Sequence, residues 1–385
     1  IYYDSQGGNG GRESPVSWLK HVEIARRFGT FPAESTSPPT LRECEALDLK
    51  ASPFTIRYTI MGGLNMKISL LEPIGIDAEL MDKLSAPLKE MGHEFVYYDN
   101  KTTDKDELLK RACDSEIVMI ANNPLPDSVI EKCDKLKMLD VAFTGIDHVG
   151  QTACKAKDVM ICNAAGYSNE TVSELAVGMA IAVLRKIAEG DKAVRNGGTL
   201  ASAGLMGTEL NTKTVGIIGT GRIGIMTAKL FKAFGCKVIG YSRTKKPEAV
   251  EAGIEYMELD DVLKTSDIVS LHIPATAETK QFINKDKIAL MKKSAILINC
   301  ARGAVVDNTA LAEALNAGDI AGAAIDVFDM EPPIPADYPL LSAKNTLLTP
   351  HVAFASKESM IRRANIVFDN LYAYLEGKPI NVVKY

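Results

Sequence analysis

The sequence predicts an α/β protein built from two doubly wound parallel sheets. From Met66 to the C-terminus, short apolar runs alternate with helical patterns, which is typical of parallel strands joined by helices. A glycine-rich turn at residues 219–224 falls in mid-chain and follows a complete strand–helix series. With 385 residues, the chain is long enough for two domains of ordinary size.

Composition excludes several classes of protein. The hydrophobic content of 46% and the charged content of 24% are typical of a globular protein. A net charge of −5 gives no electrostatic case for nucleic acid binding, and no apolar run approaches the roughly 20 residues that span a bilayer. The seven cysteines show no metal-ligand spacing, so we expect no metal, reduced thiols and a cytoplasmic location.

Residues 1–65 differ from the rest of the chain. The stretch 5–14 is rich in glycine, residues 36–40 read Thr-Ser-Pro-Pro-Thr, and no strand–helix alternation is present. We therefore predict that residues 1–65 are a non-native or disordered extension, and that the folded body begins at Met66.

The first strand–helix series runs from Met66 to the glycine-rich connection near residue 198. Asp77–Met91 is a predicted helix with Asp77 as its N-cap. The stretch 169–187 is predicted to be one long, mostly apolar helix buried between domains. The predicted strands of this series are 66–72, 94–98, 116–121, 138–143 and 159–163.

The second series opens on a strand, a GxGxxG turn and a helix. Residues 215–218 form the strand, 225–234 the helix, and 237–241 the next strand. A GxGxxG motif in this context is a strong dinucleotide-binding signal. Gly219 permits the tight turn, Gly221 lets the backbone approach a pyrophosphate, and Gly224 lets the helix pack on the strand.

The end of the second strand bears on the choice of cofactor. Proteins of this type that select NAD usually carry Asp or Glu there, but this chain has Tyr-Ser-Arg-Thr-Lys-Lys at 241–246. Arg243 can hold a ribose 2′-phosphate that a carboxylate would repel, with Ser242 and Thr244 beside it. We therefore predict that NADP(H) is preferred and that NAD(H) is possible.

Three polar side chains follow later strands. Arg302 follows 295–299, Glu331 follows 321–328, and His351 follows 346–349. In an open α/β sheet, ligands bind at the carboxyl ends of the strands. An arginine, a carboxylate and a histidine gathered there suit proton transfer to a small anionic substrate. Cys300 has no histidine close in sequence to activate it, so we interpret it as a small buried residue.

With these residues in place, the chain resembles the D-isomer-specific 2-hydroxyacid dehydrogenase family, and within it the glyoxylate and hydroxypyruvate reductases. The resemblance covers Met66 to the C-terminus. Its ordered motifs are 141–148 (VAFTGIDH), the 219–224 fingerprint, 267–274 (DIVSLHIP), 297–303 (LINCARG), 322–328 (GAAIDVF), 331–333 (EPP) and 349–351 (TPH).

The resemblance implies that a Rossmann cofactor domain is inserted into a discontinuous, flavodoxin-like substrate domain. The substrate (catalytic) domain would comprise 66–165 and 349–385, with its last helix near 356–376 crossing back. The NAD(P)-binding domain would comprise 166–348.

The resemblance also implies roles for individual residues. His351 would exchange the proton with the carbonyl oxygen, Glu331 would orient His351, and Arg302 would bind the 2-oxo acid. The backbone amides of Asn122, Asn123 and Gly145 would hold the substrate carboxylate. The implied cofactor contacts are Gly219, Gly221, Arg222, Ile223, Gly224, Ser242, Arg243, Thr244, Cys300, Ala301 and Asp326.

The expected activity is reversible reduction of a small 2-oxo acid to the D-2-hydroxy acid. By resemblance the protein would form a homodimer through the cofactor domain. A second function remains open, because some relatives are dinucleotide-sensing corepressors that retain the catalytic residues. Phe354, three residues past His351, is expected to border the substrate pocket.

Overall fold

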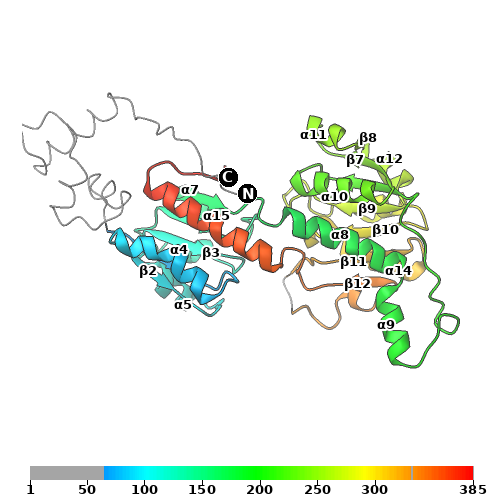
Figure 1. Ribbon diagram of the computed structural model, residues 1–385, viewed down its shortest axis with the longest axis horizontal. Coiled ribbons are helices and arrows are strands. Elements are labelled where there is room, and N and C mark those ends of the chain that lie inside the picture. Colours follow the sequence, from blue (N-terminus) through cyan, green and yellow to red (C-terminus); the bar gives the residue numbers. More distant parts are fainter. Residues whose placement is uncertain (1–64, 331–332, 385) are drawn as a thin grey trace, which may run out of the picture.

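The computed structural model describes residues 65–330 and 333–384. Two α/β lobes, each with its own sheet, make up this part of the chain (Figure 1). The predicted extension before residue 65, and Glu331 with Pro332, lie outside the described residues.

The first lobe is built on a five-stranded parallel sheet with the order β2-β1-β3-β4-β5. Its interior strands are buried on both faces, which explains their near-continuous apolar sequences. The order reverses between β1 and β3, as in flavodoxin-like sheets. The strands are β1 (Lys67–Leu70), β2 (Glu94–Tyr97), β3 (Ile117–Ile120), β4 (Met138–Val141) and β5 (Met160–Asn163). The helices joining them are α4 (Ala78–Glu90), α5 (Lys105–Ala112), α6 (Asp127–Ile130) and α7 (Gln151–Ala156).

The second lobe has a seven-stranded parallel sheet with the order β12-β11-β10-β9-β6-β7-β8. This is the Rossmann order with an added edge strand, and it reverses between β6 and β9. The strands are β6 (Thr214–Ile218), β7 (Lys237–Tyr241), β8 (Glu255–Tyr256), β9 (Ile268–Leu271), β10 (Ile296–Asn299), β11 (Gly322–Ile325) and β12 (Thr346–Leu348). The helices are α10 (Arg222–Ala233), α11 (Pro247–Glu251), α12 (Leu259–Thr265), α13 (Lys285–Ala289) and α14 (Asn308–Ala317). The predicted fold class is therefore confirmed.

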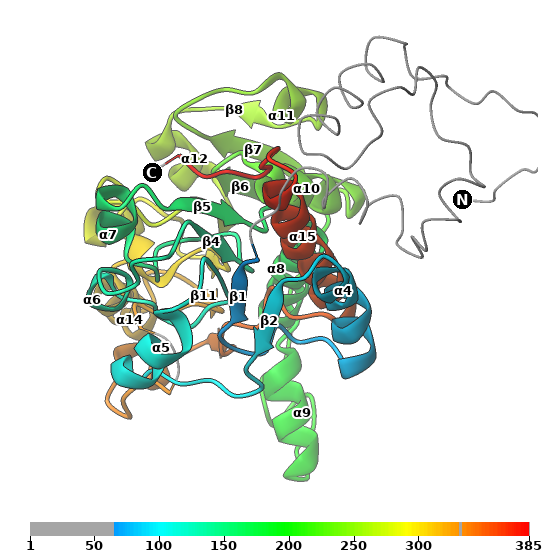
Figure 2. The same ribbon diagram turned by 90° about the vertical axis from the view of Figure 1, so that its left-hand side faces the viewer.

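The last helix, α15 (Lys357–Leu375), returns to the first lobe, where it lies beside α4 and packs on β4 and β5 (Figure 2). Ser356 begins it with a capping box, in which Ser356 and Ser359 bond each other's backbone N–H groups. Inside the lobe, Asn370 Nδ2 donates to Asp140 Oδ1 at 2.9 Å. The chain thus enters the second lobe through α8 (Asn169–Leu184) and leaves it after β12.

The stretch 169–187 is not a single helix, which corrects the sequence prediction. Helix α8 (Asn169–Leu184) ends before Lys186, whose φ of +52° is left-handed and breaks the helix, and α9 (Ile187–Arg195) starts anew. Helix α8 packs on α10 and on the second sheet, and its apolar side chains are buried there. Helix α9 projects away from the body (Figure 1).

Candidate active site

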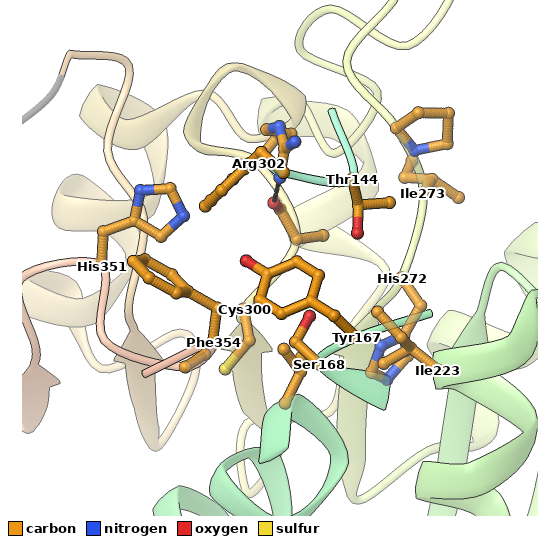
Figure 3. Close-up of a pocket in the computed structure, with 15 residues that line it drawn as sticks. Thr144, Tyr167, Ser168, Ile223, His272, Ile273, Cys300, Arg302, His351 and Phe354 are labelled. Carbon is orange, nitrogen blue, oxygen red and sulfur yellow. Dashed lines mark hydrogen bonds between the residues drawn. The ribbon is translucent and has the colours of Figure 1, made fainter. Parts of the chain in front are cut away.

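A cavity of about 240 Å³ lies where the two lobes meet (Figure 3). Segments from both lobes and from the crossing after β12 contribute to its wall. It is lined by Phe143, Thr144, Tyr167, Ser168, Val172, Ile223, His272, Ile273, Pro274, Cys300, Ala301, Arg302, His351, Ala353 and Phe354. The carboxyl ends of the strands face this cavity, as expected for an open α/β sheet.

Arg302 lies in a turn after β10 that the Asn299 side chain stabilises. The buried Asn299 side chain accepts from Ala301 N at 3.0 Å and donates to Arg302 O at 2.9 Å, which sets the direction of the chain. The Arg302 Nη1 group donates to Ala301 O, and Nη2 lies 3.4 Å from Asp147 Oδ1. The arginine side chain is 25% exposed, so its cation reaches the cavity while its base stays fixed.

His351 has a strained backbone, with a φ of +54°, in the turn after β12. Its backbone N–H donates to Asp326 O at 2.8 Å, and its ring meets Phe143 and Phe354 edge-on at centroid distances of 5.9 and 5.4 Å. These contacts hold the imidazole against the two phenylalanine rings in the wall of the cavity. Arg302 and His351, predicted from separate motifs, thus line one cavity.

Asp326 organises the segment that carries His351. Its side chain is fully buried, and its carboxylate accepts from Thr349 Oγ1, Val352 N and Ala353 N at 2.6, 2.9 and 2.9 Å. The contact of Asp326 with the cofactor therefore stays a prediction, while its bonds to this segment are part of the structure.

An aromatic wall closes one side of the cavity. Phe143, Tyr167 and Phe354 are in mutual ring contact, at centroid distances of 5.0 to 6.5 Å. Behind them the guanidinium of buried Arg363 lies 5.7 and 5.8 Å from the Tyr167 and Phe354 ring centroids. Phe354 borders the cavity as predicted. Tyr167 was not predicted, because a tyrosine in the short connection between a strand and a helix carries no spacing signal.

The glycine turn fits a dinucleotide. A β-carbon on Gly219 would come within 2.5 Å of His272 O, and one on Gly224 within 2.1 Å of Gly219 O, so both positions need glycine. A β-carbon on Gly221 would meet nothing within 4 Å, which leaves that face open. Gly221 begins α10 without a side-chain cap, so the first amides of this helix remain free to meet a phosphate.

The loop after β7 carries the residues predicted to read the 2′-position. Ser242 is half-buried, whereas Arg243 and Thr244 are exposed. Tyr256 ties this loop to the glycine turn: Lys246 N donates to Tyr256 Oη at 3.0 Å, and the same oxygen lies 2.6 Å from Thr220 Oγ1. Tyr256 was not expected, because its contacts depend on the pairing of β7 with β8.

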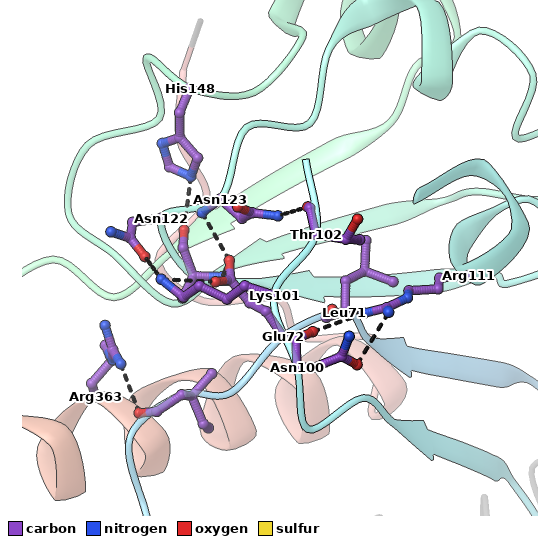
Figure 4. Close-up of polar contacts among 12 residues, drawn as sticks. Leu71, Glu72, Asn100, Lys101, Thr102, Arg111, Asn122, Asn123, His148 and Arg363 are labelled. Atoms are coloured by element: carbon purple, nitrogen blue, oxygen red, sulfur yellow. Dashed lines mark hydrogen bonds and ion pairs between the residues drawn. The ribbon is translucent and has the colours of Figure 1, made fainter. Parts of the chain in front are cut away.

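Two of the predicted substrate amides, those of Asn122 and Asn123, lie at the carboxyl edge of the first sheet (Figure 4). The N–H of Asn123 donates to Glu72 Oε1 at 2.8 Å, so this amide is already engaged. For the backbone N–H of Asn122 and of Gly145, no described residue serves as acceptor. Gly145 lies against Arg302, since a β-carbon there would come within 1.9 Å of Arg302 Nη2.

Two histidines and one cysteine near the cavity stay neutral at physiological pH. Burial lowers the pKa of His272 to about 4, and its Nε2 pairs with Ser270 Oγ at 2.9 Å. Burial also lowers the pKa of His148, whose Nε2 contacts Ala121 O at 2.7 Å. Burial raises the pKa of the Cys300 thiol far above its usual value, so this thiol is not a nucleophile. The described residues contain no cluster of His, Cys, Asp and Glu that could hold a metal ion.

The fold and the cavity define a two-lobed α/β protein of the dinucleotide-dependent dehydrogenase type. Residues 177–353 match the model of the "D-isomer specific 2-hydroxyacid dehydrogenase, NAD binding domain". The hydroxypyruvate reductase of Blautia hydrogenotrophica is 36% identical over 301 residues, covering 77% of this chain and 93% of that protein. The glyoxylate reductase of Thermofilum pendens is 38% identical over 280 residues, covering 71% and 82%.

Solved structures of dinucleotide-dependent oxidoreductases also match this chain in fold. An acyclic imino acid reductase in complex with NADPH and D-Arg matches with a TM-score of 0.75 at 29% identity, covering 83% of this chain and all of that one. The D-lactate dehydrogenase of Aquifex aeolicus, complexed with NAD and lactic acid, matches with a TM-score of 0.71 at 29% identity, covering 81% and 96%. The chain therefore belongs to the D-isomer specific 2-hydroxyacid dehydrogenase family and is an oxidoreductase. None of the described helices is long and apolar enough to cross a membrane.

Proposed function

We propose that this protein is an NADPH-preferring reductase that converts a small 2-oxo acid to the D-2-hydroxy acid. The observation that carries the proposal is that Arg302 and His351 face one interlobe cavity next to the glycine turn. An arginine binds a carboxylate by charge-assisted hydrogen bonds, and an imidazole exchanges a proton near neutral pH.

Each residue has a distinct task in this reaction. The nicotinamide supplies the hydride when bound. Arg302 neutralises the substrate carboxylate and orients the carbonyl, and His351 donates the proton to the carbonyl oxygen. Glu331 would orient His351, a role that the family resemblance implies. The aromatic wall excludes water from the side of the imidazole.

The cofactor is held by the glycine turn and by the loop after β7. The amides at the start of α10 would bind the pyrophosphate, with Arg222 and Ile223 beside it. Cys300 and Ala301 are also predicted to contact the cofactor. Ile223, Cys300 and Ala301 line the cavity, which supports this placement. Arg243 and Thr244, both exposed, with half-buried Ser242, would accept a 2′-phosphate without a competing carboxylate at the end of β7.

The substrate is proposed to be glyoxylate or hydroxypyruvate. Two similar relatives carry these reductase names. A cavity of about 240 Å³ closed by three aromatic rings suits a short 2-oxo acid better than a branched or aromatic one.

A cytoplasmic homodimer is proposed as the working form, on the family resemblance. Apolar side chains stay exposed on α9 and after it, including Val194, Leu200 and Met206 at 73%, 60% and 78% exposure, which supports contact with a second copy. No observation favours the dinucleotide-sensing corepressor.

The deciding experiment follows NADPH absorbance with a panel of 2-oxo acids. The wild-type protein is expected to reduce glyoxylate or hydroxypyruvate. The variant His351→Ala should lose reduction while NADPH binding, measured by fluorescence, stays nearly unchanged. No turnover with any 2-oxo acid would exclude the reductase function.

A further inference from the structure

A buried carboxylate lies beneath the predicted substrate amides and has no role in the function proposed above. Glu72 follows β1 at the carboxyl edge of the first sheet, and its side chain is fully buried. This edge is next to the reversal of strand order between β1 and β3, where ligands bind in open α/β sheets.

Glu72 holds the turn after β3 through two backbone bonds. Its Oε1 accepts from Ala121 N and from Asn123 N, both at 2.8 Å (Figure 4). Between these two amides lies Asn122, whose own N–H meets no acceptor among the described residues. The carboxylate therefore holds the turn by hydrogen bonds on either side of the Asn122 amide, which remains available to a ligand.

Lys101 compensates the charge of this carboxylate. Its Nζ lies 3.3 Å from Glu72 Oε2 and donates to Asn122 Oδ1 at 2.8 Å, while its side chain is 53% exposed. Glu72 Oε2 accepts no hydrogen bond from a described residue, and the Lys101 ammonium is the cation that forms an ion pair with it. A buried anion left uncompensated beside an anionic substrate would weaken binding of that substrate.

We propose that Glu72 is a positioning residue that holds the Ala121–Asn123 turn so that the Asn122 N–H meets the substrate carboxylate, with Lys101 compensating its charge. This inference rests on the proposed 2-oxo acid reductase function. Glu72 does not touch the substrate, and Lys101 acts through Glu72.

The test is a double-mutant cycle of Glu72→Gln and Lys101→Met, assayed with glyoxylate and hydroxypyruvate. Glu72→Gln should raise KM for the oxo acid about tenfold, the change given by one step of roughly 1.4 kcal/mol in binding. The kcat and the Kd for NADPH should stay near wild type. Lys101→Met should also raise KM, and the double variant should be no worse than Glu72→Gln alone.

The matched control is Lys67→Met, which removes a lysine ion pair with Asp114 at the opposite end of β1. It should leave KM unchanged. Amide hydrogen exchange gives a readout without turnover: Ala121 and Asn123 should lose protection in Glu72→Gln and keep it in Lys67→Met.

Three results would overturn the assignment of Glu72. They are an unchanged KM in the single variants, a KM in the double variant that rises by the product of the two single effects, or unchanged exchange of the Ala121 and Asn123 amides in Glu72→Gln. If Glu72→Gln raises KM, lowers kcat and weakens NADPH binding by similar factors, the role of Glu72 is merely structural. A wild-type protein that reduces neither oxo acid would instead show that the proposed function is wrong.

Discussion

Gly145 lies directly beneath the guanidinium of Arg302, because a β-carbon at residue 145 would come within 1.9 Å of Arg302 Nη2. The two residues come from different lobes, and the arginine leaves no room for a side chain at residue 145. Asp147, two residues further along, meets the same nitrogen at 3.4 Å.

The variant Gly145→Ala should therefore push Arg302 away from the substrate. We expect KM for the oxo acid to rise at least about tenfold, since a displaced arginine loses a charge-assisted bond of that order. Steady-state kinetics measure this. The control is Gly178→Ala in α8, where a β-carbon would meet nothing within 4 Å. An unchanged KM in Gly145→Ala would show that Arg302 tolerates the shift.

Arg243→Ala should reduce the preference for NADPH over NADH. The exposed guanidinium would pair with the 2′-phosphate, and losing one such pair should lower the ratio of kcat/KM values about tenfold. The control is Lys237→Ala at the other end of β7, which removes an exposed cation paired with Glu255. If the ratio stays the same, the assignment of NADPH is wrong.

Tyr256→Phe should loosen the loop that reads the 2′-position, because its hydroxyl joins Lys246 N to Thr220. Isothermal titration should show weaker binding of 2′,5′-ADP, by roughly fivefold for a net weakening of about 1 kcal/mol. Binding of 5′-AMP should change less. Tyr372→Phe, which removes a hydroxyl that donates to Leu84 O in the other lobe, should change neither.

Asp140→Asn should flatten the dependence of stability on pH. Asp140 is fully buried, only one of its oxygens has a partner, and burial raises its pKa to about 8. The folded state thus holds a proton that the unfolded state releases near pH 4, so stability falls as pH rises from about 4 to 8.

Urea unfolding at pH 5 and pH 8 measures the effect. The free energy of unfolding should fall with pH in the wild type and less in Asp140→Asn. Asp114→Asn is the control, because the hydrogen bond with Lys67 lowers the pKa of Asp114 and keeps this group charged over the whole range. Equal slopes in wild type and Asp140→Asn would mean that Asp140 is already ionised at pH 5.

Local signals in the chain were sufficient for most of the fold. The apolar runs located the strands to within a few residues, because buried parallel strands must be apolar on both faces. Asp77 caps α4 through Leu80 N as predicted. The break at Lys186 was missed, since a left-handed lysine has no sequence signal. Strand β11 ends at Ile325, earlier than the apolar run suggested, because the chain turns there so that the Asp326 carboxylate can bond the His351 segment.

The sequence by itself determined the fold class, the glycine turn and the residue types for proton transfer, because each depends on neighbours within a few positions. Only the tertiary structure decided which distant residues meet. It brought Gly145 under Arg302, Asp326 against the His351 segment, and Glu72 beneath the Asn122 turn. These contacts join strand ends that are 23 to 157 residues apart in the chain. Their partners follow from strand order and packing, which a local sequence pattern does not determine.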